Sequence, residues 1–292
     1  MVRECIVSLP DPDRTGAEKF PSVCESVMKS VGAGADAFES VLVEDAMVIH
    51  LKSQALEILT DEATASGFCS VLDSVNDAKD IQAYVQINDS ESYRQEAVED
   101  LAQAVFDKDD QTMERSWHQG FRNDYLAARF RYTLGRIQLA LMNMNKVTIA
   151  GFGGRISGEY LGLALSFDLR IATADTIFTF ENVRTGIPAG PGLTYLMPRF
   201  IGLGKALELI NRGATIDAQK ALELGLVTDI VETREELSKW YTREVQGITG
   251  HQTKLAKLNR ESIFPAAEKM QSALEQYYEA MAKAIYAARQ RS

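Results

Sequence analysis

The fold is decided by residues 146–188, which read KVTIAGFGGRISGEYLGLALSFDLRIATADTIFTFENVRTGIP. Lys146 to Gly154 is a short apolar run that enters a glycine-rich turn, as expected where a strand ends. A helix is predicted from about Gly158 to Phe167, and another strand from Leu169 to Ala174. Alternating strands and helices of this kind predict an α/β fold with a parallel-rich sheet.

The segment before this stretch contains further strand and helix signals. Ser40 to Leu51 reads SVLVEDAMVIHL, two β-prone runs separated by Glu44-Asp45, which is typical of a hairpin. A helix from about Thr60 to Val75 and a strand from Ile81 to Ile87 should follow. From about Glu96 to Asn143 apolar residues recur at helical spacing, which predicts one or two long helices.

The last third of the chain, from Lys205 onward, is expected to be mostly helical. Asp217 is suited to cap the start of one helix, and Tyr277-Tyr278 should lie on a long terminal helix. We therefore divide the chain into three predicted parts. These are an N-terminal extension at 1–38, an α/β core at 39–235 and a C-terminal helical region at 236–292.

Composition excludes several classes of partner. The 292 residues include 31 basic and 41 acidic side chains, which gives a formal charge of −10 and a pI near 5.0. Nucleic acid and anionic membrane surfaces are therefore poor partners. The three cysteines fit neither a disulfide framework nor a metal site. No signal-like or membrane-spanning run is present, so a cytoplasmic protein is expected.

The stretch from Lys146 to Val231 resembles the crotonase (enoyl-CoA hydratase/isomerase) superfamily, and the resemblance extends more faintly back to Ser40. Residues 168–172, DLRIA, and 221–227, ALELGLV, are the clearest matches. The resemblance implies a spiral of ββα units with a C-terminal helical trimerisation region, as a homotrimer or a dimer of trimers. It also implies an acyl thioester of coenzyme A or of a carrier protein as substrate, with coenzyme A as part of the substrate and no separate cofactor.

The resemblance also implies an oxyanion hole, two backbone N–H groups that stabilise the thioester oxygen as it gains charge. One donor falls at Gly158-Glu159-Tyr160, at the start of the predicted helix, where the family usually has three glycines. Gly154 matches a family glycine in the preceding turn. The other donor falls within residues 88–98, which read NDSESYRQEAV and contain no glycine.

Hydratases of the family place two glutamates across the pocket, where they hold and activate water. By position, the resemblance places these two sites at Gly162 and Asn182. Neither residue can transfer a proton at neutral pH, so ordinary hydration would need a replacement acid. Glu159 and Glu181 are the two candidates.

Each candidate has a structural interpretation beside the catalytic one. Glu181 can anchor a loop, and Glu159 can simply complement the helix dipole. Asn182 can orient a substrate by hydrogen bonding or cap a loop. Tyr160 can donate to an enolate, or it can pack its ring and leave its hydroxyl at water. His118 lacks a Ser, Cys or second His at triad-like spacing and is assigned no catalytic role.

Three functions remain open, and whether the chain is an enzyme is left undecided. The first is an isomerase, lyase or hydrolase that stabilises an enolate without hydrating. The second is a non-catalytic partner or scaffold subunit of a hetero-oligomer. The third is an enoyl-CoA hydratase that uses Glu159 or Glu181.

Overall fold

A mixed α/β architecture is described by the computed structural model, which covers residues 5–6, 36–56, 58, 61–88, 92, 131–186, 188–190, 192–248, 250–263 and 267–291. The described strands form a main sheet in the order β1-β2-β3-β4-β5-β7-β10. Their bounds are β1 Cys5–Ile6, β2 Phe38–Val43, β3 Ala46–Leu51, β4 Ala83–Asn88, β5 Val147–Phe152, β7 Leu169–Thr173 and β10 Asp229–Val231.

The sheet is antiparallel at one edge and parallel elsewhere. β2 and β3 form the predicted hairpin around Glu44-Asp45, and β1 pairs antiparallel with β2. β3, β4, β5, β7 and β10 are parallel neighbours. A small second sheet contains β6 Arg155–Ser157, β8 Ile177–Thr179 and β9 Thr215–Asp217. The prediction of a parallel-rich sheet is thus confirmed.

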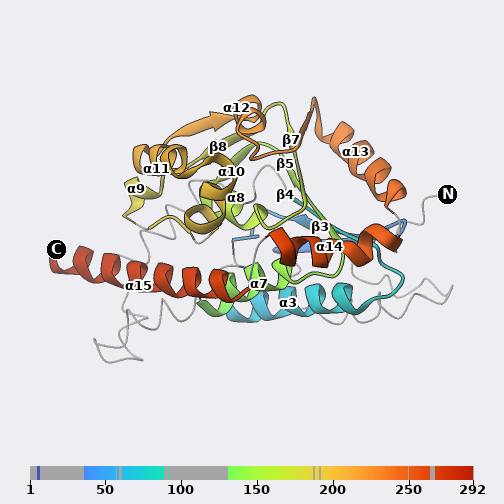
Figure 1. Cartoon of the computed structure of the whole chain (residues 1–292), viewed down its shortest axis with the longest axis horizontal. Helices are drawn as coiled ribbons and strands as arrows, with labels where there is room; N and C mark the ends of the chain where they lie inside the picture. The colour runs from blue at the N-terminus through green and yellow to red at the C-terminus, as the bar shows by residue number, and fades with distance from the viewer. Residues whose placement is uncertain are drawn as a thin grey trace.

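Helices surround the main sheet (Figure 1). Their bounds are α3 Glu62–Asp77, α7 Arg136–Met142, α8 Gly158–Ala164, α9 Asn182–Thr185, α10 Met197–Ile201, α11 Leu203–Arg212, α12 Ala218–Glu223, α13 Arg234–Gly247, α14 Gly250–Ile263 and α15 Ala267–Arg291, with π-helical segments η1 Arg131–Gly135 and η2 Gly192–Leu196. Asp217 caps α12 by accepting from Lys220 N at 2.7 Å, as predicted. α8 ends earlier than predicted, because Ser166 N and Phe167 N bond three residues back and form a turn.

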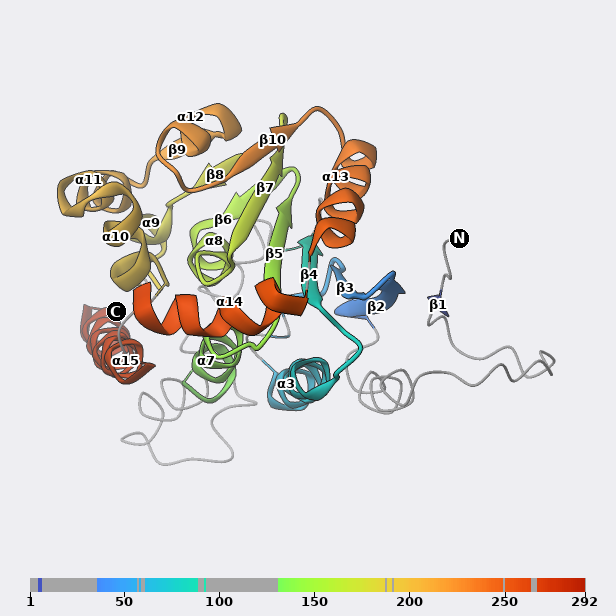
Figure 2. The ribbon, with the colours of Figure 1, turned by 45° about the vertical axis from the view of Figure 1, so that its right-hand side comes forward.

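The two faces of the sheet carry separate cores, because side chains alternate along a strand. In β4, Tyr84 joins the larger core, which α3, α8 and α15 also supply, whereas Val85 joins the smaller one. The smaller core contains Leu237, Trp240 and Tyr241 of α13. Figure 2 shows α13 on one side of the strands and α8 on the other.

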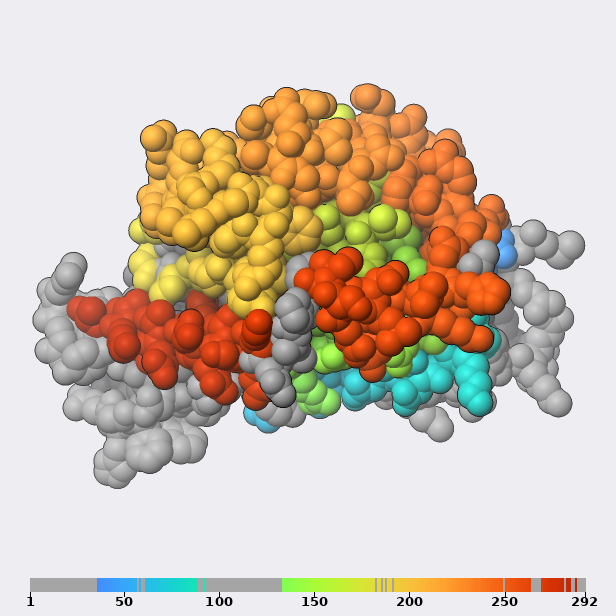
Figure 3. Space-filling view, viewed as in Figure 1, coloured from blue at the N-terminus to red at the C-terminus, as the bar shows by residue number. Residues whose placement is uncertain are grey.

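The C-terminal helices lie against the rest of the molecule. Figure 3 shows α14 and α15 on one face, with α14 beside the segment that leads from α3 into β4. Met270, Leu274, Tyr277 and Tyr278 of α15 are buried in the larger core. The division of the chain at residues 38 and 235 stays a prediction, as does trimerisation. Most of the predicted helical stretch at 96–143 lies outside the described residues.

Candidate active site

The turn between β5 and β6 is the first part of the candidate site. Gly154 has a φ of 77°, a conformation that glycine adopts without strain. Asn88, at the end of β4, holds the turn by two hydrogen bonds, from its Nδ2 to Gly153 O at 3.0 Å and from Gly153 N to its Oδ1 at 3.1 Å. A Cβ at residue 153 would lie 2.7 Å from Arg234 Nη2. The turn-forming interpretation is confirmed for Gly153 and Gly154, whereas Gly151 belongs to β5.

Arg234, the first residue of α13, completes this connection. Its Nη1 donates to Asn88 O at 2.8 Å and its Nη2 donates to Gly153 O at 3.1 Å. The C-terminal ends of β4 and β5 are therefore tied together by two side chains, those of Asn88 and Arg234. This arrangement fixes the backbone that leads into β6 and α8. Asn88 begins the segment 88–98 in which the resemblance places the other donor, whereas nothing in the sequence pointed to Arg234 as part of the site.

α8 begins directly after β6, so Gly158, Glu159 and Tyr160 form its first turn. The helix start therefore lies where the resemblance placed one oxyanion donor. For the other predicted donor, within residues 88–98, the structure describes only Asn88 and Ser92. Ser92 is buried, and its hydroxyl donates to Leu51 O at 2.6 Å. The oxyanion hole stays a prediction.

Glu159 supplies the carboxyl group of this first turn. The residue keeps part of its surface exposed, but protein surrounds its carboxyl group and removes water from it. This desolvation raises the pKa of Glu159 to about 7, although a hydrogen bond from its own backbone N–H opposes the rise. Burial raises the pKa of the Tyr277 hydroxyl on α15. The charge of the nearby Glu159 raises that pKa further. Sequence spacing gave no signal for this pairing.

Tyr160 is packed inside the larger core. Its side chain is fully buried, and its ring meets Phe152 edge-on, with the centroids 5.8 Å apart. Gln86 Nε2 donates to the Tyr160 hydroxyl at 3.2 Å, and Tyr84 OH donates to Gln86 Oε1 at 2.8 Å. Burial raises the pKa of Tyr160 far above its ordinary value. The predicted packing of the ring is therefore confirmed, but the expectation that the hydroxyl stays at water is wrong, because it is bonded to Gln86 inside the core.

Gly162 lies in a close backbone contact between α8 and η2. A Cβ at residue 162 would come 2.9 Å from Leu193 N and 3.3 Å from Gly192 C. A Cβ at Gly192 would approach the carbonyl oxygen of Gly162 even more closely. The site that the resemblance assigns to a hydratase glutamate therefore has no room here for any side chain.

Glu181 lies just before α9 and is an ion-paired carboxylate. Its side chain is 10% exposed, and its Oε1 lies 3.5 Å from Arg155 Nη2 and 3.3 Å from Arg184 Nη1. Arg155 belongs to β6, so this pairing connects α9 to the strand that precedes α8. The loop-anchoring interpretation fits these contacts. Asn182 is the first residue of α9, and its side chain lies outside the described part of the structure.

A model of the family described as Enoyl-CoA hydratase/isomerase matches residues 115–290. Because this match covers more than half of the chain, the protein belongs to the enoyl-CoA hydratase/isomerase family, within the crotonase superfamily. Curated relatives include "Probable enoyl-CoA hydratase echA12" of Mycobacterium leprae, 31% identical over 125 residues, which are 42% of each chain. "Enoyl-CoA hydratase ACTT3" of Alternaria alternata is 36% identical over 97 residues, or 33% of each. These matches thus span less than half of the relatives' length.

Solved structures show the same fold over a larger part of the chain. An enoyl-CoA hydratase from Bacillus halodurans aligns with a TM-score of 0.68 and 22% identity, covering 87% of this chain and 98% of its own. An enoyl-CoA hydratase from Thermoplasma volcanium aligns with a TM-score of 0.62 and 21% identity, covering 88% and 97%. At these identities the likeness establishes the fold alone.

The described residues contain no group of three or more His, Cys, Asp or Glu side chains that could hold a metal ion. Within the same part of the chain, no helix is long and apolar enough to cross a membrane.

Proposed function

We propose that this family member binds an acyl thioester and transfers a proton at the carbon next to the thioester carbonyl, with Glu159 as the acid-base group. The observation that carries this proposal is the Glu159 carboxyl group in the first turn of α8, whose pKa is raised to about 7. A proton-transferring group acts best when its pKa is near the working pH. At neutral pH Glu159 is present in both protonation states.

The proposed reaction is an isomerisation. The Glu159 carboxylate removes a proton from the carbon next to the carbonyl, and the electron pair moves onto the thioester oxygen to give an enolate. Backbone N–H groups at the start of α8 are the proposed donors to that oxygen. The protonated Glu159 then returns the proton to a different carbon, so the double bond moves and no water is consumed.

Two contacts favour this reaction over two-glutamate hydration. Gly162 has no space for a carboxylate, because Leu193 N would be 2.9 Å from its Cβ. Glu181 is paired with Arg155 and Arg184.

The same proposal includes three further expectations. The protein is a homotrimer or a dimer of trimers, coenzyme A is part of the substrate rather than a cofactor, and the location is cytoplasmic.

The test combines binding with turnover. Thermal unfolding of the full chain is measured with free coenzyme A and with a panel of short, medium and aromatic acyl-CoA and enoyl-CoA compounds. A ligand at about 100 times its Kd adds ~2.7 kcal/mol, which raises the Tm by about 4 to 5 °C in a chain of this size. We expect a shift that depends on the acyl group. We then expect turnover of the binding enoyl-CoA to its isomer.

Glu159→Gln and Glu181→Gln form the matched pair of variants. Glu159→Gln should lower turnover by about 10² to 10⁴-fold while keeping the ligand-dependent shift, and Glu181→Gln should keep most of the turnover. Unchanged turnover in Glu159→Gln would contradict the proposed role. A product that has gained water would identify the hydratase alternative.

The partner-subunit alternative has its own structural support. The first two turns of α8 serve packing, because Tyr160 is buried and Gly162 contacts η2. A scaffold subunit should show no Tm shift with any thioester in the panel. That result would overturn the catalytic proposal and favour this alternative.

A further inference from the structure

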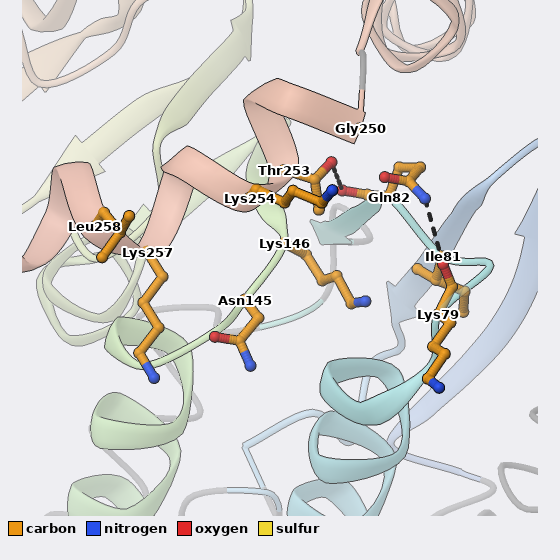
Figure 4. Close-up of a pocket in the computed structure, with 10 residues that line it drawn as sticks. All are labelled: Lys79, Ile81, Gln82, Asn145, Lys146, Gly250, Thr253, Lys254, Lys257 and Leu258. Carbon is orange, nitrogen blue, oxygen red and sulfur yellow. Dashed lines mark hydrogen bonds between the residues drawn. The ribbon is translucent and has the colours of Figure 1, made fainter.

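A second candidate site lies at the N-terminal ends of the parallel strands, whereas the turn that leads into α8 follows the C-terminal end of β5. A pocket of about 600 Å³ opens beside the N-terminal ends of β4 and β5, under the first half of α14. Figure 4 shows its lining from three segments, the residues before β4, the residues before β5, and α14. Its volume lies within the usual range for small-molecule sites, roughly 300 to 1,000 Å³.

The lining of this pocket is cationic. It includes four lysines, Lys79, Lys146, Lys254 and Lys257, and no carboxylate. Lys257 Nζ lies 3.9 Å from Glu261 Oε1 on the same helix. The salt bridges found among the described residues include none for the other three lysines. The pocket therefore concentrates positive charge on a chain whose net charge is −10.

Lys146 is the buried member of this group, with 6% of its surface exposed. Its Nζ donates to Ala78 O, and burial lowers the pKa of its ammonium group, which the nearby Asp80 and Asp77 oppose. These two aspartates are not part of the pocket lining. A partly desolvated ammonium gains from an anionic partner, because such a partner replaces the lost hydration.

The walls of the pocket are fixed by hydrogen bonds. Arg260 of α14 donates from Nη2 to Lys146 O at 3.0 Å and from Nη1 to the Asp168 carboxylate. Thr253 Oγ1, also on α14, donates to Gln82 O at 3.3 Å (Figure 4). α14 is thereby bonded to the segments before both strands. The segments that carry the lysines are held in place without a ligand, so less ordering of the backbone is required on binding.

We propose that this pocket binds a small molecule with two or more phosphate groups, of the nucleoside diphosphate class. Several ammonium groups from different segments match the distributed charge of a diphosphate, and lysine binds phosphate as a point charge. The side-chain amides of Asn145 and Gln82 and the exposed apolar surface of Leu258 supply hydrogen-bonding and apolar contacts for the remainder of such a ligand. This site is separate from the thioester site proposed at α8.

The test is calorimetric titration of the full chain with ADP. One double variant, Lys79→Gln with Lys254→Gln, removes two exposed pocket lysines. A matched double variant, Lys239→Gln with Lys283→Gln, removes two exposed lysines on α13 and α15 that do not line the pocket. We expect ADP to bind the wild type and the control equally. Loss of charge-assisted bonds should weaken binding to the pocket variant by about tenfold or more.

Competition then tests whether this site is separate from the thioester site. Inorganic phosphate should displace ADP, and added salt should weaken binding. ADP binding that excess acyl-CoA leaves intact would support a nucleotide site separate from the thioester site, whereas displacement of ADP by acyl-CoA would overturn that separation. Failure of ADP to bind the wild type would overturn the proposal. Equal binding to the two double variants, with unchanged circular dichroism, would overturn it as well.

Discussion

The starts of α8 and α9 each carry a glutamate, but the two carboxylates have opposite surroundings. In the first turn of α8, desolvation of the Glu159 carboxyl group raises its pKa to about 7. Glu181 before α9 lies within 3.5 Å of two arginine side chains. The same residue type at a similar position in a helix is therefore suited to proton transfer in one place and to anchoring in the other.

This difference teaches that the neighbours of a carboxylate, more than its place in a motif, decide its chemistry. The resemblance places one of the two hydratase glutamates at Gly162, one turn from Glu159 along α8. The backbone at Gly162 packs directly against the backbone of η2, whereas Glu159 lies near Tyr277 of α15. A carboxylate can therefore be accommodated at the first turn of α8 and not at the second.

The largest expected effect on stability comes from adding a side chain at the second turn of α8. Gly162→Ala places a Cβ 2.9 Å from Leu193 N, so α8 and η2 must separate. We expect a loss of roughly 1 to 3 kcal/mol in the free energy of unfolding, measured by urea denaturation.

Gly204→Ala is the control for this substitution. Gly204 also lies in a helix, α11, but its added Cβ would meet no heavy atom within 4 Å. That variant should be neutral or slightly stabilising. Equal stability of the two variants would show that the contact between α8 and η2 tolerates a side chain.

The next effect is a pH dependence that follows from the raised pKa of Glu159. The folded chain binds this proton more tightly than the unfolded chain does, so the contribution of Glu159 to stability is complete below about pH 4.5. It is lost as the pH rises through about 7. Across that window the wild type should lose stability relative to Glu159→Gln.

Urea denaturation of both chains at each pH measures this difference. The comparison cancels the titration of groups that the two chains share. A difference in unfolding free energy that stays constant from pH 4.5 to pH 7.5 would show that the Glu159 carboxyl group is not desolvated.

The smallest effect is expected at Glu181. Glu181→Gln removes two ion pairs, but Arg155 and Arg184 are 41% and 65% exposed, so water screens both. We expect a loss of about 1 kcal/mol in unfolding free energy. Glu235→Gln is the control, because its pair with Lys239 is 3.8 Å long and exposed on both sides. Equal losses in both variants would mean that burial of Glu181 adds nothing.

Much of the core architecture could be predicted from local patterns. The hairpin of β2 and β3, the strand β5 that leads through glycines into α8, and the Asp217 cap of α12 were all predicted from short stretches. These features depend on residues a few positions apart, so the sequence contains the full physical cause. The packing role of Tyr160 also followed from its residue type.

The candidate site was predicted less completely, because its defining contacts join distant segments. Arg234 binds Asn88 across 146 positions, and Tyr277 influences Glu159 from the last helix. The reason for glycine at residue 162 is a backbone 30 positions away in η2. None of these contacts has a periodicity or a spacing that a single sequence can reveal.

The sequence by itself determined the α/β order of elements, the family resemblance and the two carboxylates worth testing. Propensity, alternation and capping act over a few residues, so they can be recognised without coordinates. Only the tertiary structure decided that Glu159 is desolvated, that Glu181 is paired, and that lysines from three segments line one pocket. Desolvation and charge pairing depend on distances between segments, and only the folded chain sets those distances.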